Sequence, residues 1–267
     1  MSSGPRPKRL LLFGLLGLAA FAFVSIAGAA RSNEKVHIRV GDLVIDGSGG
    51  FKPELLPKHH DAPIKIYGGG KVSTVSGELP PILDTIEFEF DKHGHVDTTG
   101  IEVCTAGKLQ ATDVPAARRA CPNAIVGKGF GRAIVAFPEQ APIPVSSPIT
   151  AFNGPRKNGN PTVLFHAFTT VPVATTFIVP VVIEKIHNGI YGYRVKAQIP
   201  KIAGGYGHPV SGRLTVDRKT RVKGKLHSYV NARCELGRLQ ARGKFVFKDG
   251  TRLSGTFVRP CKAIPGT

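Results

Sequence analysis

Short apolar runs separated by clusters of Gly and Pro dominate the pattern of this chain. Its 267 residues include 32 Gly and 21 Pro, and 42% are hydrophobic, which is typical of a packed domain with many turns. Runs rich in Val, Ile, Phe and Thr recur between these clusters. We expect strands at Val36–Ile45, Ile64–Val75, Thr85–Phe90, Ala124–Phe137, Ile149–Phe152, Thr162–Val171, Thr176–Ile186, Tyr191–Ile199, Val210–Val216, Lys225–Ala232, Arg238–Phe247 and Thr251–Val258. The chain is therefore predicted to be all-β, an antiparallel sandwich or barrel of roughly a dozen strands.

The last two predicted strands form a hairpin whose turn can be specified. A two-residue loop at Asp249–Gly250 would place Phe247 opposite Arg252, which mixes apolar and charged residues on one face. A three-residue loop over 248–250, with Gly250 in the left-handed conformation, pairs odd positions with odd ones. The hydrophobic pattern favours this loop, because one face then carries Phe245, Phe247, Leu253 and Phe257.

Helix signals are rare, and one short helix is expected near 114–121. Asp113 can cap its first turn, and Pro115 suits that turn because proline has no N–H to leave unpaired. The Ala and Arg residues that follow are strong helix formers.

The first 29 residues have the pattern of a signal peptide. A basic segment with Arg6, Lys8 and Arg9 precedes the uncharged apolar run Leu10–Ile26, and Ala27-Gly28-Ala29 offers small residues for cleavage. The alternative is an uncleaved anchor, for which seventeen apolar residues are at the short end. We therefore expect a signal peptide over 1–29 and an exported β domain over 30–267, extracellular or in the cell envelope.

No later segment is predicted to cross a membrane as a helix. The most apolar one, Val171–Ile183, is short and broken by Pro172 and Pro180. It is predicted to be a buried or edge strand.

Four cysteines agree with an oxidising compartment. An even number in an exported chain indicates two disulfides, and three pairings are possible. The local pairing, Cys104–Cys121 with Cys234–Cys261, closes two modest loops and should form most easily. By chain entropy, each bridge would stabilise the fold by roughly 3 kcal/mol. A zinc site is the alternative, but the sequence has no C-x-x-C motif.

A short internal similarity surrounds the first cysteine of each pair. Residues 104–111, CTAGKLQA, resemble residues 234–241, CELGRLQA, and each segment follows a strand that ends in Asp and a basic residue. Two readings remain open. The similarity is chance, or it marks two related disulfide-closed β units over 30–153 and 154–267.

Several segments together resemble a group of exported bacterial β-rich proteins of uncharacterised function. The resemblance lies in Leu56–Lys58, Ala62–Ile64, Phe88–Lys92, Ala124–Gly127, Phe152–Gly154, His166–Phe168 and Pro200–Gly205, together with the four Cys. It implies a secreted, disulfide-bearing β protein. It implies no activity, ligand or catalytic residue.

Positive charge is concentrated toward the C-terminus. From Arg194 onward, 17 Lys and Arg stand against three Asp and Glu, a net of +14, whereas residues 30–193 have a net of +1. Such asymmetry indicates an anionic partner. The candidate anion-binding residues are Arg213, Arg218, Lys219, Arg221, Lys223 and Lys225. On one extended strand the last four would share a face, and the alternative is an edge strand protected by lysines or a solvated hairpin.

The sequence shows no recognisable catalytic motif. There is no G-x-S-x-G and no H-E-x-x-H, and cysteines in disulfides leave no thiol nucleophile. His93-Gly94-His95 is expected at a hairpin tip rather than at a metal, His166 in the core, and Asp46–Gly50 as a flexible turn. We expect no cofactor, no metal, and no specific nucleic-acid binding, since no recognition helix is readable.

The first expectation is thus a non-enzymatic exported protein that binds an anionic envelope polymer or membrane surface through its basic C-terminal region. The second is a β-barrel carrier of a small apolar ligand. The third is a secreted hydrolase of unfamiliar type.

Overall fold

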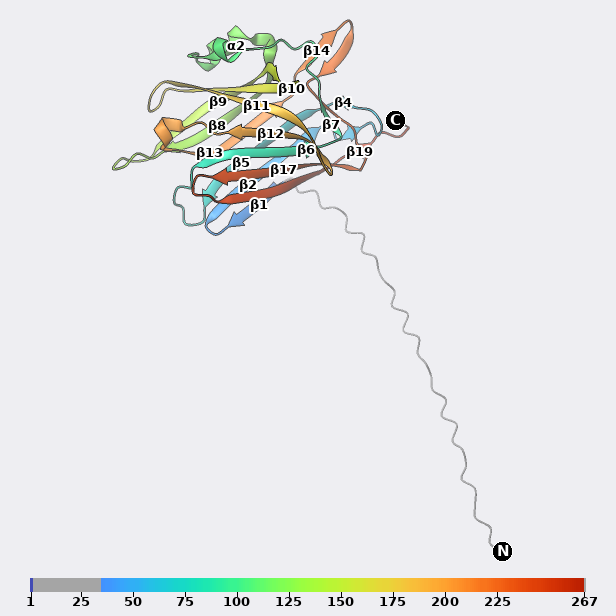
Figure 1. The fold of residues 1–267 in the computed structure, drawn as a ribbon, viewed down its shortest axis with the longest axis horizontal. Helices are drawn as coiled ribbons and strands as arrows, with labels where there is room; N and C mark the ends of the chain where they lie inside the picture. Colours follow the sequence, from blue (N-terminus) through green and yellow to red (C-terminus); the bar gives the residue numbers. More distant parts are fainter. Residues whose placement is uncertain (2–34, 267) are drawn as a thin grey trace. The chain divides into compact units, whose positions relative to one another are not determined.

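The computed structural model describes Met1 and residues 35–266, so the predicted signal peptide lies, apart from Met1, outside the described residues. Twelve antiparallel strands form a single sheet, and most are long, as Figure 1 shows. They are β1 (Lys35–Val40), β2 (Leu43–Lys52), β5 (Lys65–Thr74), β6 (Leu83–Asp91), β8 (Ile125–Val135), β9 (Ile143–Lys157), β10 (Asn160–Thr169), β11 (Thr175–Asn188), β12 (Tyr191–Gln198), β13 (Gly207–Val216), β17 (Arg238–Phe247) and β18 (Arg252–Pro260). The predicted all-β class is confirmed.

The sheet curls into a nearly closed barrel. Its strand order is β1-β2-β5-β13-β8-β9-β10-β11-β12-β6-β17-β18. The first and last strands pack side by side, because a Cβ on Gly255 of β18 would come within 2.5 Å of Ile38 on β1. Closure in this way leaves only a short seam of unpaired edge, which is how barrels manage exposed strand edges.

One end of the barrel is closed by shorter elements. These are β3 (Leu55–Leu56), β4 (Ala62–Pro63), β7 (Gly94–Val96), β16 (Val230–Ala232) and β19 (Lys262–Ala263), and the hairpin of β14 (Lys219–Val222) and β15 (Lys225–Ser228) lies beside them. A buried cluster joins these segments to the strand ends: Leu56, Ile64, Tyr229 and Cys234 pack with Phe51 of β2 and other barrel residues. The turns of the β1–β2, β8–β9, β10–β11 and β17–β18 hairpins lie at the opposite end (Figure 1).

Two helices cover part of the barrel's outer surface. They are α1 (Ala106–Leu109) and α2 (Val114–Ala120), followed by the 3-10 turns η1 (Pro122–Ala124) and, much later, η2 (Ile202–Gly205). As predicted, the Asp113 carboxylate accepts a hydrogen bond from the Ala116 N–H and caps α2. Leu109 and Ala117 then pack with Phe152 of β9 and Leu164 of β10 outside the barrel.

Both disulfides join the predicted partners. Cys104 is bonded to Cys121 and Cys234 to Cys261. The β17–β18 hairpin is also confirmed in detail: Phe245 pairs with Leu253, and Gly250 has φ +88°.

Other local expectations are corrected. Residues 36–45 form parts of two strands joined by a turn at 41–42, and residues 225–232 are split between β15 and β16. The supposed flexible turn Asp46–Gly50 lies within β2. The two similar segments differ in structure, since residues 106–109 form α1 whereas 238–241 begin β17.

Candidate functional site

The barrel's inner wall is apolar on every side. Successive side chains of a strand point to opposite faces of the sheet, so every second residue points into the barrel. Inward residues from four strands pack against the buried cluster of the closed end: Ile66 of β5, Leu214 of β13, Phe165 of β10 and Val195 of β12. Strands that are far apart in the sheet order therefore point apolar side chains into the same interior.

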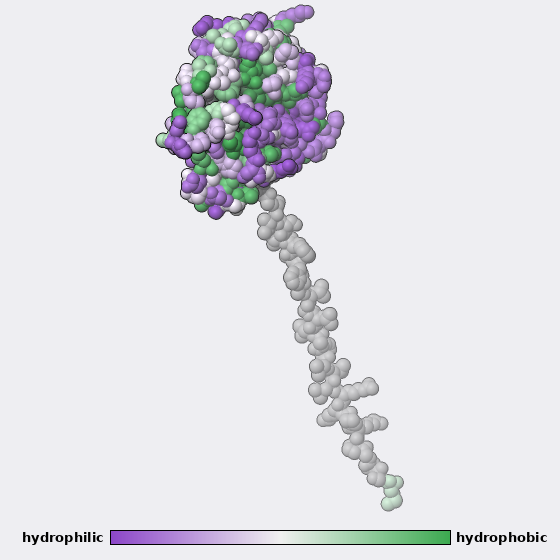
Figure 2. Space-filling model, turned by 60° about the vertical axis from the view of Figure 1, so that its left-hand side comes forward, coloured by the Kyte–Doolittle hydropathy of each residue, from purple (hydrophilic) through white to green (hydrophobic). Residues whose placement is uncertain are grey.

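Many side chains of this inner wall stay only partly buried. The interior residues that remain only partly buried are Ile66, Phe88, Phe165, Phe177, Val179, Tyr193, Val195, Ala197 and Leu214. In a well-packed core such residues are fully buried. Figure 2, turned so that the hairpin-turn end comes forward, shows hydrophobic residues gathered at the centre of this face among hydrophilic ones. The inner wall of the barrel thus carries apolar side chains that stay partly accessible to solvent.

Glycines lie side by side on one wall of the barrel, where the Phe257 ring fills the space at Gly47 and Ile149 lies against Gly131. Gly47, Gly70, Gly212 and Gly131 lie directly opposite one another on β2, β5, β13 and β8. A Cβ on Gly212 would meet only the Phe130 carbonyl oxygen, at 3.8 Å, and one on Gly68 only backbone, at 3.6 Å and beyond. Among the described residues, no side-chain atom lies within 4 Å of a Cβ built at either of these two positions.

The outer side of the barrel carries charged residues on β6 and β17. Glu87 and Glu89 of β6 lie opposite Lys244 and Arg242 of β17. Glu89 is only 2% exposed and accepts a hydrogen bond from Arg242 Nε at 2.7 Å. Burial disfavours the charged form of Glu89, but the hydrogen bonds from Arg242 and Asn188 and the charge of Lys244 outweigh it and hold its pKa below the ordinary value.

The barrel wall divides between β11 and β12. These strands pair at Ile183–Val195, Glu184–Arg194, Lys185–Tyr193 and Asn188–Tyr191. From Thr175 to Val182, β11 pairs with β10 alone, and Lys196–Gln198 pair with β6 alone. A cavity of about 320 Å³ opens here, lined by Pro180, Val182, Glu184, Lys196 and Gln198.

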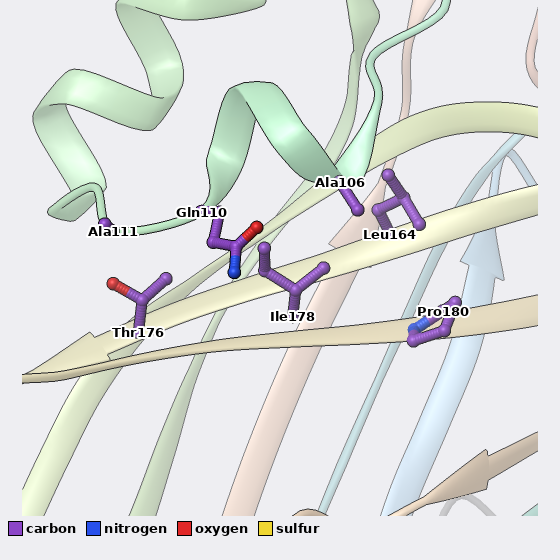
Figure 3. Close-up of a pocket in the computed structure, with 7 residues that line it drawn as sticks. All are labelled: Ala106, Gln110, Ala111, Leu164, Thr176, Ile178 and Pro180. Carbon is purple, nitrogen blue, oxygen red and sulfur yellow. The ribbon is translucent and has the colours of Figure 1, made fainter.

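A second outer cavity, of about 420 Å³, adjoins the first at Pro180. Figure 3 shows Thr176, Ile178 and Pro180 along β11 and Leu164 on β10, with Ala106, Gln110 and Ala111 from α1 and the turn after it above them. None of these lining residues is charged or offers an acid–base pair, so this groove carries no recognisable catalytic chemistry.

The predicted basic row is divided by a turn. Lys223 and Gly224, both with positive φ, connect β14 to β15. Lys219 and Arg221 share one face of this hairpin, whereas Lys225, opposite Val222, lies on the other. The expectation that four alternate cations share one strand face is therefore wrong, although all four are exposed.

The other two candidate cations lie elsewhere. Arg213 is on the outer side of β13, with its guanidinium 5.8 Å from the centre of the Phe130 ring. Arg218 is partly buried, just before the hairpin.

Two of the histidines singled out in the sequence are buried. His93 is 2% exposed, with Nδ1 2.7 Å from Asp91 and Nε2 3.1 Å from Glu235. His166 is fully buried beneath the helices, as predicted, and burial lowers its pKa. No group of three His, Cys, Asp or Glu suited to a metal occurs among residues 35–266.

No protein-family model, curated protein or solved structure matches this chain. The resemblance to exported bacterial proteins therefore stays a prediction. Within the described part of the chain, no helix has the length and apolar character needed to cross a membrane. The two disulfides indicate folding in an oxidising environment.

Proposed function

We propose that this protein is a non-enzymatic carrier that binds a small, uncharged, apolar molecule inside its barrel. The observation that carries this proposal is the inner wall, where aromatic and aliphatic side chains from six strands stay only partly buried. Small-molecule sites are typically concave, largely apolar and partly preformed. A ligand that removes about 200 Å² of such surface from water gains roughly 5 kcal/mol before the costs of association.

Binding of the fluorescent apolar probe N-phenyl-1-naphthylamine to the purified full chain, with both disulfides formed, tests this proposal. Ala197 and Lys196 provide a matched pair on β12, because Ala197 points inward and Lys196 lines the outer cavity. Ala197→Phe fills interior space, so we expect the probe's affinity to fall by about tenfold or more, a loss of at least ~1.4 kcal/mol.

Lys196→Phe adds the same ring outside and should leave affinity unchanged. Absence of probe binding to the unaltered protein would reject the carrier proposal. A loss of affinity in Lys196→Phe, with Ala197→Phe unaffected, would move the site to the outer cavity and equally contradict an interior ligand.

We also propose that the carrier is exported to the extracellular space or the cell envelope after removal of residues 1–29. The disulfides and the sequence pattern of the first residues support this. Intact-mass analysis of the exported form should show a start at Ala30 or Arg31. A full-length mass at the membrane would identify the segment as an anchor.

A second candidate function is attachment to an anionic surface through the β14–β15 hairpin. Lys219, Arg221, Lys223 and Lys225 are exposed on this one small element, which Figure 1 shows projecting beside the closed end. Clustered cations of this kind attract polyanions in a salt-dependent manner.

Vesicles that contain phosphatidylglycerol provide the probe for this candidate. Changing the four hairpin cations to Gln should weaken sedimentation with the vesicles and flatten its salt dependence. The matched control changes four exposed lysines elsewhere: Lys71, Lys128, Lys157 and Lys185. An equal effect of both sets would show that net charge alone matters, and would reject the hairpin as a site.

A further inference from the structure

The point where β11 and β12 separate forms a fork in the barrel wall. Their last pair toward the turn end is Ile183–Val195. If the ladder continued, Val182 would lie opposite Lys196 and Pro180 opposite Gln198. Instead, these four side chains line one cavity, together with Glu184 at the base of the fork. The ladder is interrupted at this point, and the outward side chains of both strands line an open groove beyond it.

The sequence at the fork is consistent with an edge left unpaired. Pro180 has no backbone N–H, and proline within sheets is found mainly where the donor is not needed by a neighbouring strand. The stretch Phe177–Ile183 is apolar at every position, a pattern typical of strands buried on both faces. Here its outer side chains, including Ile178 and Pro180, remain partly or fully accessible.

The fork lies between the outer cavity and the apolar interior. On the inner side, Phe177 and Val179 of β11 and Ala197 of β12 are only partly buried. Ala197 is small, so the inner side of the fork is not filled from β12. The closed end offers no comparable route, because Leu56, Tyr229, Cys234 and their neighbours form a buried cluster there.

We propose that this fork is the lateral portal through which the apolar ligand enters and leaves the barrel. The inference rests on the carrier function proposed above. On the outer side of the fork the ligand would contact Pro180 and Val182, and on the inner side it would contact Val179 and Ala197. The charged ends of Glu184 and Lys196 flank this path and keep it accessible to water when no ligand passes.

Closing the fork with a cross-link tests the portal. Val182→Cys with Lys196→Cys introduces two thiols on facing sides of the cavity, which can be joined by a disulfide or by bismaleimidoethane. The matched control, His37→Cys with Asp46→Cys, joins an exposed pair that the β1–β2 ladder already holds together, away from the fork. The native cysteines are at most 7% exposed, so mild reductant opens the engineered disulfide first.

Stopped-flow fluorescence with N-phenyl-1-naphthylamine measures both rates. We expect the cross-linked fork to slow probe association and dissociation together by about tenfold or more, as for other gated sites, with equilibrium affinity nearly unchanged. The control cross-link should leave both rates unaltered, and reduction should restore the first variant.

The outcomes separate this inference from the function on which it rests. Unchanged rates in the cross-linked variant, with the probe still bound, would overturn the portal, favour entry between the hairpin turns and leave the carrier function intact. Failure of the unaltered protein to bind the probe would instead overturn the carrier function, and the portal with it.

Discussion

For Glu89, the sequence pattern predicts the direction of the side chain correctly but its exposure to solvent wrongly. The alternation of Glu87 and Glu89 with Phe88 and Phe90 correctly predicts that the glutamates point away from the core. It also predicts solvent exposure, which is wrong for Glu89, because Arg242, Lys244 and Asn188 cover it. Both cations, Arg242 and Lys244, come from β17, far along the chain, so the local pattern could not place them.

We predict that Glu89→Gln destabilises the fold at neutral pH by about 1–3 kcal/mol, because it leaves a partly buried guanidinium without its charge partner. The lowered pKa of Glu89 sets the pH dependence. Its contribution is full above the ordinary carboxyl value of 4.5 and is lost as pH falls through the folded-state pKa. Urea unfolding at pH 7 and pH 3 should therefore show the difference between variant and parent shrinking in acid.

Glu184→Gln is the control for this prediction. Glu184 pairs with Arg194 across an exposed surface, and such pairs contribute less than about 1 kcal/mol. A pH-independent difference for Glu89→Gln would contradict the ionic explanation and leave a packing effect.

His93 marks the limit of inference at the residue scale. Residues 92–93 form the expected turn, but the expected hairpin is wrong, because Gly94 and His95 continue into β7 (Gly94–Val96), which pairs with β16 rather than with β6. The burial of His93 depends on Glu235, brought beside it by the Cys234 segment, and nothing in the local sequence indicates that contact.

Among the elements, the β17–β18 hairpin could be specified most fully from the sequence. Its apolar positions distinguish a three-residue from a two-residue loop, and the observed register follows the former. Local patterns suffice here because a hairpin's register is fixed by residues that are neighbours in the chain.

We predict that Gly250→Ala destabilises the protein by about 1 kcal/mol. Its Cβ would meet no atom within 4 Å, so the cost comes from φ +88° alone. Gly107→Ala is the matched change, since Gly107 also has open space but lies in α1 with an ordinary φ. It should be neutral or stabilise by up to ~1 kcal/mol. Thermal unfolding of the two variants would contradict this explanation if both shifted in the same direction.

The β14–β15 hairpin matches only the alternative interpretation of the basic segment, and the fork was not predicted. Lys223-Gly224 is a weak turn signal within an alternating basic segment, so a single extended strand was equally consistent with the sequence. The fork depends on where the β11–β12 ladder stops, although each strand alone has an ordinary apolar pattern. Such separation is decided by the curvature of the whole barrel rather than by either strand.

At the scale of the whole molecule, the folded structure brings C-terminal cations close to acidic residues from earlier in the chain, and part of the charge asymmetry is neutralised. The acidic strand β6 lies between the basic strands β12 and β17. Cations from the C-terminal part consequently pair with earlier acids, among them Arg242 with Glu89, Arg233 with Asp61 and Lys248 with Asp84. This reduces the one-sided field inferred from composition and leaves the β14–β15 hairpin as the clearest cationic element.

The strand count could be predicted from the sequence, but the strand order could not. Placing β13 between β5 and β8 requires contacts between distant segments, and no local pattern specifies them. Interior space is equally invisible in a sequence, because Gly68 and Gly212 resemble ordinary turn residues until the register shows which way they face. For this reason the carrier function stood only as an alternative at first.

The two disulfides occupy different layers of the molecule, which allows the closed end to be tested separately from the outer surface. Cys234 and Cys261 belong to the buried cluster at the closed end, whereas Cys104 and Cys121 belong to the cluster beneath the helices outside the barrel. The bridges span 27 and 17 residues, so chain entropy predicts a similar loss of roughly 3 kcal/mol when either is removed.

We therefore predict that replacing either cysteine pair by serine lowers stability to a comparable extent, while only one replacement alters the barrel. Loss of Cys234–Cys261 should weaken N-phenyl-1-naphthylamine binding several-fold, because the cluster at the closed end holds the strand ends that shape the interior. Loss of Cys104–Cys121 should leave affinity unchanged in the folded protein. Probe titration at low temperature, where near-UV circular dichroism confirms that both variants are folded, makes the comparison. Equal weakening by both replacements would mean that the helices outside the barrel also shape its interior.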